Sequence, residues 1–185
     1  MTGRTAVSTV RHLGPDDVEA WWPVYEAAFA PMATRAAARH LLTRDEFAEE
    51  MGDDRILKLL ARDDEGRAVA MTTIATDVSA VPWISPDYYR AKHPEALARN
   101  ALWYVGYTLA HPSERRTTAF VDMLDALIDM LADGRVTVGY DVSRFNDLSH
   151  HFADHLFRRA RRVSDLTADE VDVQTYYTAT FSRRR

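Results

Sequence analysis

Residues 101–131, ALWYVGYTLAHPSERRTTAFVDMLDALIDML, join two apolar runs through a polar turn. The first run, residues 101–109, is nearly continuously apolar and has the length of one strand, which predicts a central strand covered on both faces. In the second run, from about Thr118 to Leu131, apolar residues recur at helical spacing while aspartates occupy the opposite face. The stretch therefore predicts a buried strand, a turn and an amphipathic helix.

The residues at the N-terminal end predict one strand followed by one helix. Residues 5–13 have an extended pattern that stops at a Gly-Pro pair. The following run has acidic residues at its start and apolar residues at helical spacing, which is typical of a helix. Proline cannot donate a main-chain hydrogen bond, so we expect Pro23 to end or kink the first turns of this helix.

A second helix and a hairpin are predicted between the first helix and the apolar stretch. Thr43 and Glu46, three residues apart, form the pattern of a capping box at a helix start. Residues 56–78 contain two β-rich runs joined by a polar turn, which predicts a hairpin. Residues 79–100 carry three prolines and several aromatic residues, so we expect an irregular excursion there.

The C-terminal part predicts a strand, a helix and a last strand. Apolar and polar residues alternate in 135–142, and a helix is expected from about Asn146 to Arg159. In residues 171–181 every second side chain is apolar or small, which predicts a long strand that could be an exposed edge. Such an edge could pair two copies into a homodimer. The side chains expected on its apolar face are Val171, Val173, Tyr177, Ala179 and Phe181.

This order of elements predicts a mixed α/β sheet with helices packed on both faces. The 185 residues are enough for one domain with a sizeable core, so residues 1–185 are expected to form a single domain. A net charge of −5 argues against a general nucleic-acid binder. No segment reaches the apolar length of a membrane span, and the N-terminal residues lack the apolar core of a secretory signal.

The chain contains no cysteine. Disulfides, thiolate metal ligands and cysteine nucleophiles are therefore excluded, and a cytoplasmic protein is expected. His151 and His155 are four residues apart on one helix, but no third metal ligand follows at a recognisable spacing. We therefore expect structural histidines and no metal site.

The element order, together with the turn after the apolar strand, resembles the GNAT superfamily of acyl-CoA-dependent N-acyltransferases. The resemblance covers most of the chain in element order, and its motifs lie within residues 102–157. It implies a mostly antiparallel central sheet. It also implies that an acyl-CoA enters a wedge between the central strand and the strand in residues 135–142.

In that family, a strand ending in Val-x-Pro is followed by Gln/Arg-x-x-Gly-x-Gly/Ala, whose backbone amides and helix N-terminus bind the pyrophosphate of coenzyme A. Residues 110–112, Ala-His-Pro, stand in place of Val-x-Pro, and Arg115 takes the Gln/Arg position. Thr118 and Phe120 replace the two small residues, so the phenyl ring must point into the core if the turn is to hold the cofactor. By this resemblance, acetyl-CoA or another acyl-CoA would be bound by Ala110, Arg115, Arg116, Thr117 and Thr118.

A second motif follows at residues 140–149, YDVSRFNDLS, which is similar to the family pattern Leu-Glu-Val, three residues, Asn and a later small residue. The resemblance implies that Asp141 helps to deprotonate an amine and that Asn146 contacts the cofactor. A general-acid tyrosine of the family falls on Ala153 here. The residue at the position of a family glutamate on the central strand is Tyr104, which could donate a proton to a leaving thiolate.

Each of these residues also has a structural explanation. Asp141 could be a solvent-facing or capping residue, and Tyr104 could serve only in aromatic packing. The two arginines could form a surface pair, and Thr117 and Thr118 could cap the following helix. The sequence thus predicts an acyl-CoA-dependent N-acyltransferase acting on a small amine. The alternative is a catalytically inactive module of the same fold that binds a metabolite or a protein partner.

Overall fold

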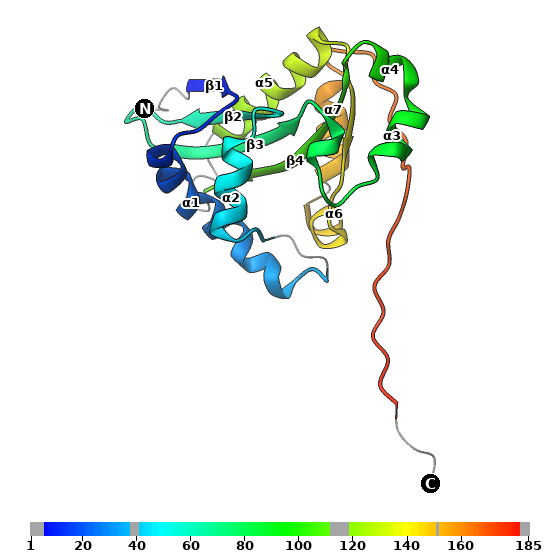
Figure 1. The fold of residues 1–185 in the computed structure, drawn as a ribbon, viewed down its shortest axis with the longest axis horizontal. Coiled ribbons are helices and arrows are strands. Elements are labelled where there is room, and N and C mark those ends of the chain that lie inside the picture. The colour runs from blue at the N-terminus through cyan, green and yellow to red at the C-terminus, as the bar shows by residue number, and fades with distance from the viewer. Residues whose placement is uncertain (1–5, 38–40, 112–118, 151, 182–185) are drawn as a thin grey trace.

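The sheet of this protein has the strand order β1-β2-β3-β4-β5, in which β1 to β4 are antiparallel neighbours and β5 runs parallel to β4 (Figure 1). The computed structural model describes residues 6–37, 41–111, 119–150 and 152–181. The predicted mixed and mostly antiparallel sheet is confirmed. The strands are β1 Ala6–Val10, β2 Ile56–Arg62, β3 Ala68–Ala75, β4 Leu102–Ala110 and β5 Thr137–Tyr140.

Helices cover both faces of the sheet. Leu59 on β2 belongs to the cluster packed under α5 (Ala119–Asp133), whereas the next residue, Leu60, packs with α1 (Pro15–Phe29) and α2 (Arg44–Gly52). Adjacent residues of a strand point to opposite faces, so the two clusters lie on opposite sides of the sheet. The predicted burial of both faces is confirmed. The other helical elements are η1 Ala30–Thr34, η2 Val78–Ala80, α3 Pro86–Lys92, α4 Pro94–Ala98, α6 Arg144–His150 and α7 Phe152–Ala160.

The capping box of α2 forms as predicted. Thr43 Oγ1 accepts a hydrogen bond from the main-chain N–H of Glu46, and the Glu46 carboxylate accepts one from the N–H of Thr43. Two N–H groups that the helix cannot satisfy by itself are thus paired. On the inner side of α2, Phe47 and Met51 are completely buried, which fixes how the helix is rotated against the sheet.

Two expectations about prolines need correction. Pro23 does not end α1, which continues to Phe29, because the buried residues Trp21, Val24 and Tyr25 hold the helix on the core on both sides of the proline. The segment 79–100 is also not irregular, since it contains η2, α3 and α4. Its prolines Pro86 and Pro94 occupy the first positions of α3 and α4, where a missing N–H costs no hydrogen bond.

The C-terminal predictions need three corrections. The strand predicted over 135–142 is limited to β5, and the single helix predicted from Asn146 to Arg159 consists of α6 and α7. The strand predicted over 171–181 is wrong, because this segment has no partner strand in the described part of the chain. It extends away from the domain (Figure 1), and its side chains are exposed.

Candidate functional site

A bulge in β4 marks the centre of the sheet. Thr72 pairs with Thr108 and Ile74 pairs with Val105, so β4 contains one residue more than β3 between these pairs. A Cβ atom on Gly106 would lie 2.6 Å from Oγ1 of Thr73, which leaves room for glycine alone. The N–H of Tyr107 donates to the same hydroxyl at 3.3 Å. The main chain of β4 therefore approaches Thr73 closely at the bulge.

The bulge lies where β4 and β5 separate. Pairing between these strands runs from Leu102 with Thr137 to Val105 with Tyr140, and β5 ends there while β4 continues to Ala110. Residues 106–110 of β4 thus have no partner on β5. This geometry agrees with the predicted wedge between the two strands.

A cavity of about 330 Å³ opens at the bulge, on the side of the sheet that carries α2 and η2. Gly106 and Thr73 line it from the strands, and Glu50 lines it from α2. Trp83, in the connection between η2 and α3, lines it as well. Its other lining residues are Leu42, Glu46, Glu49, Asp53, Ile56, Ala75, Ala80, Val81 and Pro82.

Glu50 is the carboxyl group of this cavity with the largest change in pKa. Burial raises the pKa of Glu50 from 4.5 to about 7, although a hydrogen bond with Thr73 and the charge of Lys58 act in the opposite direction. Lys58 is completely buried, and its ammonium group donates to the carbonyl oxygens of Arg11 at 2.7 Å and Asp53 at 2.9 Å. Burial lowers the pKa of Lys58 to about 8. The Glu50 carboxyl group therefore lies in desolvated surroundings that disfavour its charged form, and the nearby cation Lys58 offsets only part of this effect.

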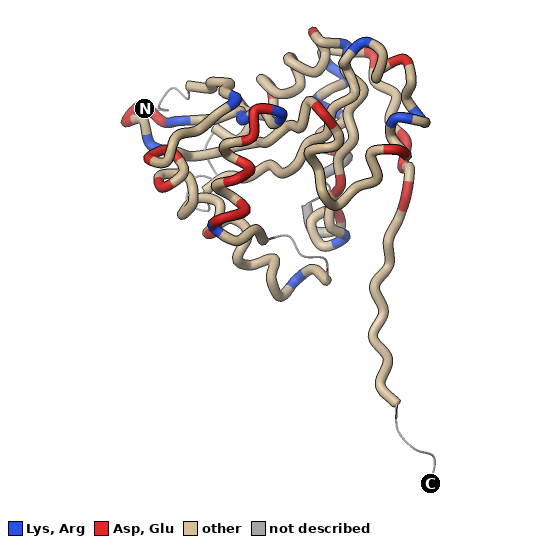
Figure 2. Tube along the Cα trace, in the orientation of Figure 1, with Lys and Arg blue, Asp and Glu red and all other residues tan. Residues whose placement is uncertain are grey.

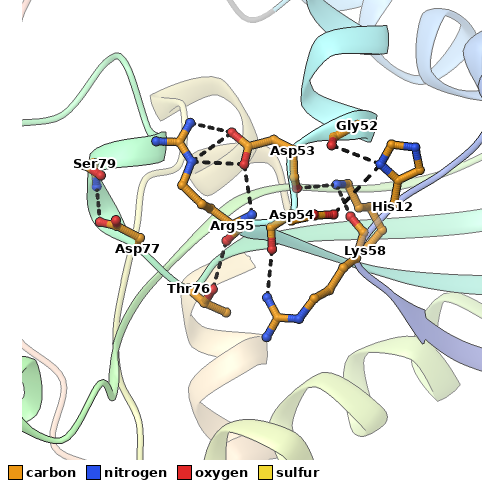
Figure 3. A network of polar contacts seen from close by, with 10 residues as sticks. His12, Gly52, Asp53, Asp54, Arg55, Lys58, Thr76, Asp77 and Ser79 are labelled. Carbon is orange, nitrogen blue, oxygen red and sulfur yellow. Dashed lines mark hydrogen bonds and ion pairs between the residues drawn. The ribbon is translucent and has the colours of Figure 1, made fainter.

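Polar contacts hold the connection from α2 to β2 (Figure 3). The guanidinium of Arg55 donates to both carboxylate oxygens of Asp53, and the main-chain N–H of Arg55 donates to Asp53 Oδ1 at 2.9 Å. These hydrogen bonds keep the pKa of Asp53 below its usual range. The carbonyl group of Arg55 accepts from the Thr76 hydroxyl on the β3 side at 2.9 Å. The C-terminal end of α2, where Glu50 lies, is thereby fixed to the sheet.

The structure brings the two predicted catalytic residues together. Tyr104, only 1% exposed, donates its hydroxyl to Asp141 Oδ1 at 2.6 Å, and the Trp83 indole N–H donates to the same oxygen at 3.2 Å. Burial raises the pKa of Tyr104 above its ordinary value, and the bond to Asp141 adds to this effect. The ring of Tyr104 packs against Gly139 on β5. A Cβ atom on Gly139 would lie 2.7 Å from Cδ2 of this ring.

Tyr104 and Asp141 stand beside the cavity, and neither lines it. Trp83 connects the two places, since it lines the cavity and binds Asp141. The Tyr104 proton points to the carboxylate of Asp141, so this hydroxyl is committed to an internal hydrogen bond. Two donors share Asp141 Oδ1, which orients the carboxylate.

The predicted cofactor residues are only partly within the described structure. Ala110, at the end of β4, is buried in the cluster under α5, and Asn146 is half-buried on α6 with its main-chain N–H bonded to Ser143 Oγ at 3.2 Å. Phe120 packs on the same cluster as Ala110, as the resemblance requires. The predicted residues Arg115, Arg116, Thr117 and Thr118 lie outside the described residues.

Sequence reasoning missed Glu50. On α2 it is one of several acidic residues (Figure 2), and nothing in its spacing distinguishes it from a residue on a solvated helix face. No group of three or more His, Cys, Asp or Glu side chains suitable for a metal ion occurs in the described part of the chain. His151, one member of the predicted histidine pair, lies outside that part. Among the described helices, none is both long and apolar enough to cross a membrane.

Sequence comparison finds no matching family model and no matching curated protein. Solved structures, however, share the fold of this chain. The Escherichia coli ribosomal-protein-S18-alanine N-acetyltransferase matches at 17% identity with a TM-score of 0.53, over 84% of this chain and 75% of that chain. An aminoglycoside acetyltransferase from an uncultured soil metagenomic sample, solved with sisomicin, matches at 13% identity with a TM-score of 0.55, over 95% and 97% of the two chains.

Aminoglycoside N-acetyltransferase AAC(6')-Iy in complex with CoA matches at 10% identity, with a TM-score of 0.55, over 95% of this chain and 97% of that chain. At these identities the likeness establishes the fold. The chain has the fold of GNAT acetyltransferases, and the predicted resemblance and fold class are confirmed.

Proposed function

We propose that this chain, which has the GNAT fold, is an acyl-CoA-dependent N-acyltransferase that acts on a small amine. One observation supports this most directly: the cavity reaches Gly106 on β4 at the point where β4 and β5 separate. An amine in the cavity and an acyl group between the separated strands would meet at the bulge. One neighbour of the same fold, AAC(6')-Iy, was solved both with CoA and with a bisubstrate analogue of CoA and acetylneamine.

In the proposed reaction, the amine nitrogen attacks the thioester carbonyl carbon. A C–N bond forms, the C–S bond breaks, and the sulfur leaves as a thiolate that takes up a proton. Main-chain amides of β4 beyond Val105 would stabilise the negative charge on the carbonyl oxygen. Holding the two reactants side by side lowers the barrier greatly, so the absence of a tyrosine at Ala153 is compatible with catalysis.

The proposed cofactor is acetyl-CoA or another acyl-CoA, with its pyrophosphate at Arg115, Arg116, Thr117 and Thr118 and a further contact from Asn146. The position of Phe120 supports this arrangement, because this residue is partly buried and packs against the core cluster under α5. The absence of cysteine supports a cytoplasmic location, and the net charge of −5 speaks against nucleic acid as the substrate.

Acyl-CoA binding is expected to raise the melting temperature of the protein. At a hundred times its dissociation constant, a ligand specific for the folded state stabilises by about 2.7 kcal/mol, which corresponds to roughly 5–10 °C for a chain of this size. The measurement is a thermal shift with acetyl-CoA and with longer acyl-CoAs. The double substitution Arg115→Glu and Arg116→Glu should remove the shift, whereas Arg161→Glu and Arg162→Glu should retain it. No shift at any chain length would favour the catalytically inactive module.

We also propose that two copies associate through residues 171–181. This segment has alternating apolar side chains, and Tyr177 and Phe181 are 88% and 94% exposed. β5 forms an edge of the described sheet and pairs there only with β4. Each copy therefore offers the edge strand β5 and the extended segment 171–181, which we call the arm. In a symmetric dimer, the arm of each copy would pair with β5 of the other copy.

The dimer should depend on the apolar face of the arm. Replacing Tyr177 and Phe181 by Lys is expected to weaken association roughly tenfold or more, because charges would enter the shared sheet surface. Replacing Gln174 and Thr178 by Lys, on the opposite face, should have little effect. Analytical ultracentrifugation over a range of protein concentrations measures the association of the wild-type protein and of both double variants. A wild-type protein that is monomeric throughout would contradict the proposal.

A further inference from the structure

We propose that Glu50 is the general base that removes a proton from the acceptor amine in the cavity at the β4 bulge, and that the acceptor enters as an ammonium ion. This inference rests on the proposed function and assigns its proton acceptor and the charge of its substrate. It replaces the sequence-based prediction that Asp141 is the base.

Glu50 is placed at the cavity by the packing of α2. Phe47 and Met51 are fully buried on the inner side of the helix, and Glu46 and Glu50, one turn apart, line the cavity. Glu50 is hydrogen-bonded to Thr73, whose hydroxyl lies 2.6 Å from the Cβ position of Gly106. One side chain therefore separates this carboxyl group from the main chain of the bulge, where the thioester would react.

Asp141 is less well placed for the same task. It does not line the cavity, and its Oδ1 already accepts hydrogen bonds from Tyr104 and Trp83. These contacts suit a residue that positions Trp83 at the cavity wall.

The groups around Glu50 explain its readiness to exchange a proton near neutral pH. Lys58 is the cation that favours its charged form, and Asp53 acts against that form. Glu46 and Glu49 line the same cavity. The pKa of the half-buried Tyr107 is raised well above its ordinary value, mainly by desolvation and also by the charge of Glu50, which lies close to it. Desolvation is the largest influence, and with a pKa of about 7 both protonation states of Glu50 are populated at neutral pH.

The cavity walls indicate the class of acceptor. Its charged lining residues are all acidic, which favours a cation over an anion. The lining also has an apolar part, which includes Ile56, Val81, Pro82 and Trp83. We therefore expect a primary amine with a short apolar or aromatic part next to the ammonium group.

The proposed proton steps balance. The Glu50 carboxylate takes one proton from the ammonium ion, and the neutral amine attacks the thioester. When the C–S bond breaks, the second proton lost by nitrogen goes to the thiolate, which leaves as the CoA thiol. The protonated Glu50 then returns its proton to water.

The test is the pH dependence of CoA release by the wild-type protein and by Glu50→Gln. Because the chain has no cysteine, a thiol reagent detects only the CoA thiol. With acetyl-CoA and a panel of tyramine, tryptamine and spermidine, Glu50→Gln should lower kcat roughly 10²–10⁴-fold and remove the rise in kcat/KM through pH 7. Glu50→Asp should restore part of the rate, and Asp45→Asn, on the exposed side of α2, should leave the profile unchanged.

The outcomes separate this inference from the proposed function. Glu50→Gln should keep the thermal shift with acetyl-CoA, because the carboxyl group is assigned to the amine alone. If the wild-type protein acylates an amine and Glu50→Gln retains the rise through pH 7, Glu50 is not the base. If Asp141→Asn removes that rise instead, Asp141 is the base. A wild-type protein that releases no CoA with any of these amines contradicts both proposals.

Discussion

Replacing Phe47 by Ala is expected to lower the free energy of unfolding by about 3–5 kcal/mol, the usual cost of truncating a buried aromatic residue to Ala. Phe47 is completely buried, and the centroid of its ring lies 4.9 Å from that of Tyr25 and 5.6 Å from that of Trp22. These three side chains join α2 to α1. The truncation removes the contact of one ring with both others and leaves a cavity that the flanking helices cannot fill.

Urea denaturation followed by far-ultraviolet circular dichroism measures this loss. Glu49→Ala is the matched control, since Glu49 is exposed on the same helix and its truncation should change stability by less than about 0.5 kcal/mol. A loss below about 1 kcal/mol for Phe47→Ala would mean that α2 is not held by this ring. The placement of Glu50 would then need another explanation.

The parts of the fold that were predicted correctly depend on local sequence. The capping box at Thr43 and Glu46 involves residues three apart, and the hairpin of β2 and β3 is set by two β-rich runs and the polar turn between them within residues 56–78. β4 follows from a nearly continuous apolar run, and α5 follows from apolar residues at helical spacing. In each case the segment contains the interactions that determine its structure.

The errors arose where distant contacts decide the structure. Pro23 removes one helix hydrogen bond, but the buried residues on either side belong to a core built from other segments. Residues 171–181 have the pattern of a strand, and a strand also needs a partner, which the described chain does not supply. The alternation of apolar and polar residues predicts which side chains would share a face of a strand. It does not predict whether another segment packs on that face or pairs with the strand.

The candidate site shows the same contrast between what local sequence predicts and what distant contacts decide. Asp141 and Tyr104 were chosen from motif positions, and their hydrogen bond of 2.6 Å depends on the pairing of β4 with β5, which spacing alone could not predict. Glu50 could not be found at all, because its burial and its contact with Thr73 require α2 to pack over the bulge of a strand that comes much later in the chain.

The stability of the protein is expected to decrease as the pH rises from about 4.5 to about 7, by up to about 3 kcal/mol from Glu50 alone. The pKa of Glu50 is about 7 in the folded protein and 4.5 as the reference for the unfolded chain. Within this window the folded state binds more protons than the unfolded state. The contribution is therefore fully present below pH 4.5 and is lost as the pH rises through 7.

Glu50→Gln isolates this effect, because its amide does not titrate and fits nearly the same space. The stability of the variant relative to wild type should increase over this window, as measured by urea denaturation at a series of pH values. Lys58 acts at higher pH: its pKa of about 8 lies below the reference value of 10.5, so stability should rise again with pH between these values in both proteins. A difference between the two proteins that does not change from pH 4.5 to 7.5 would show that Glu50 titrates normally. The carboxyl group would then lack the desolvated surroundings that suit it to accept a proton from an amine at neutral pH.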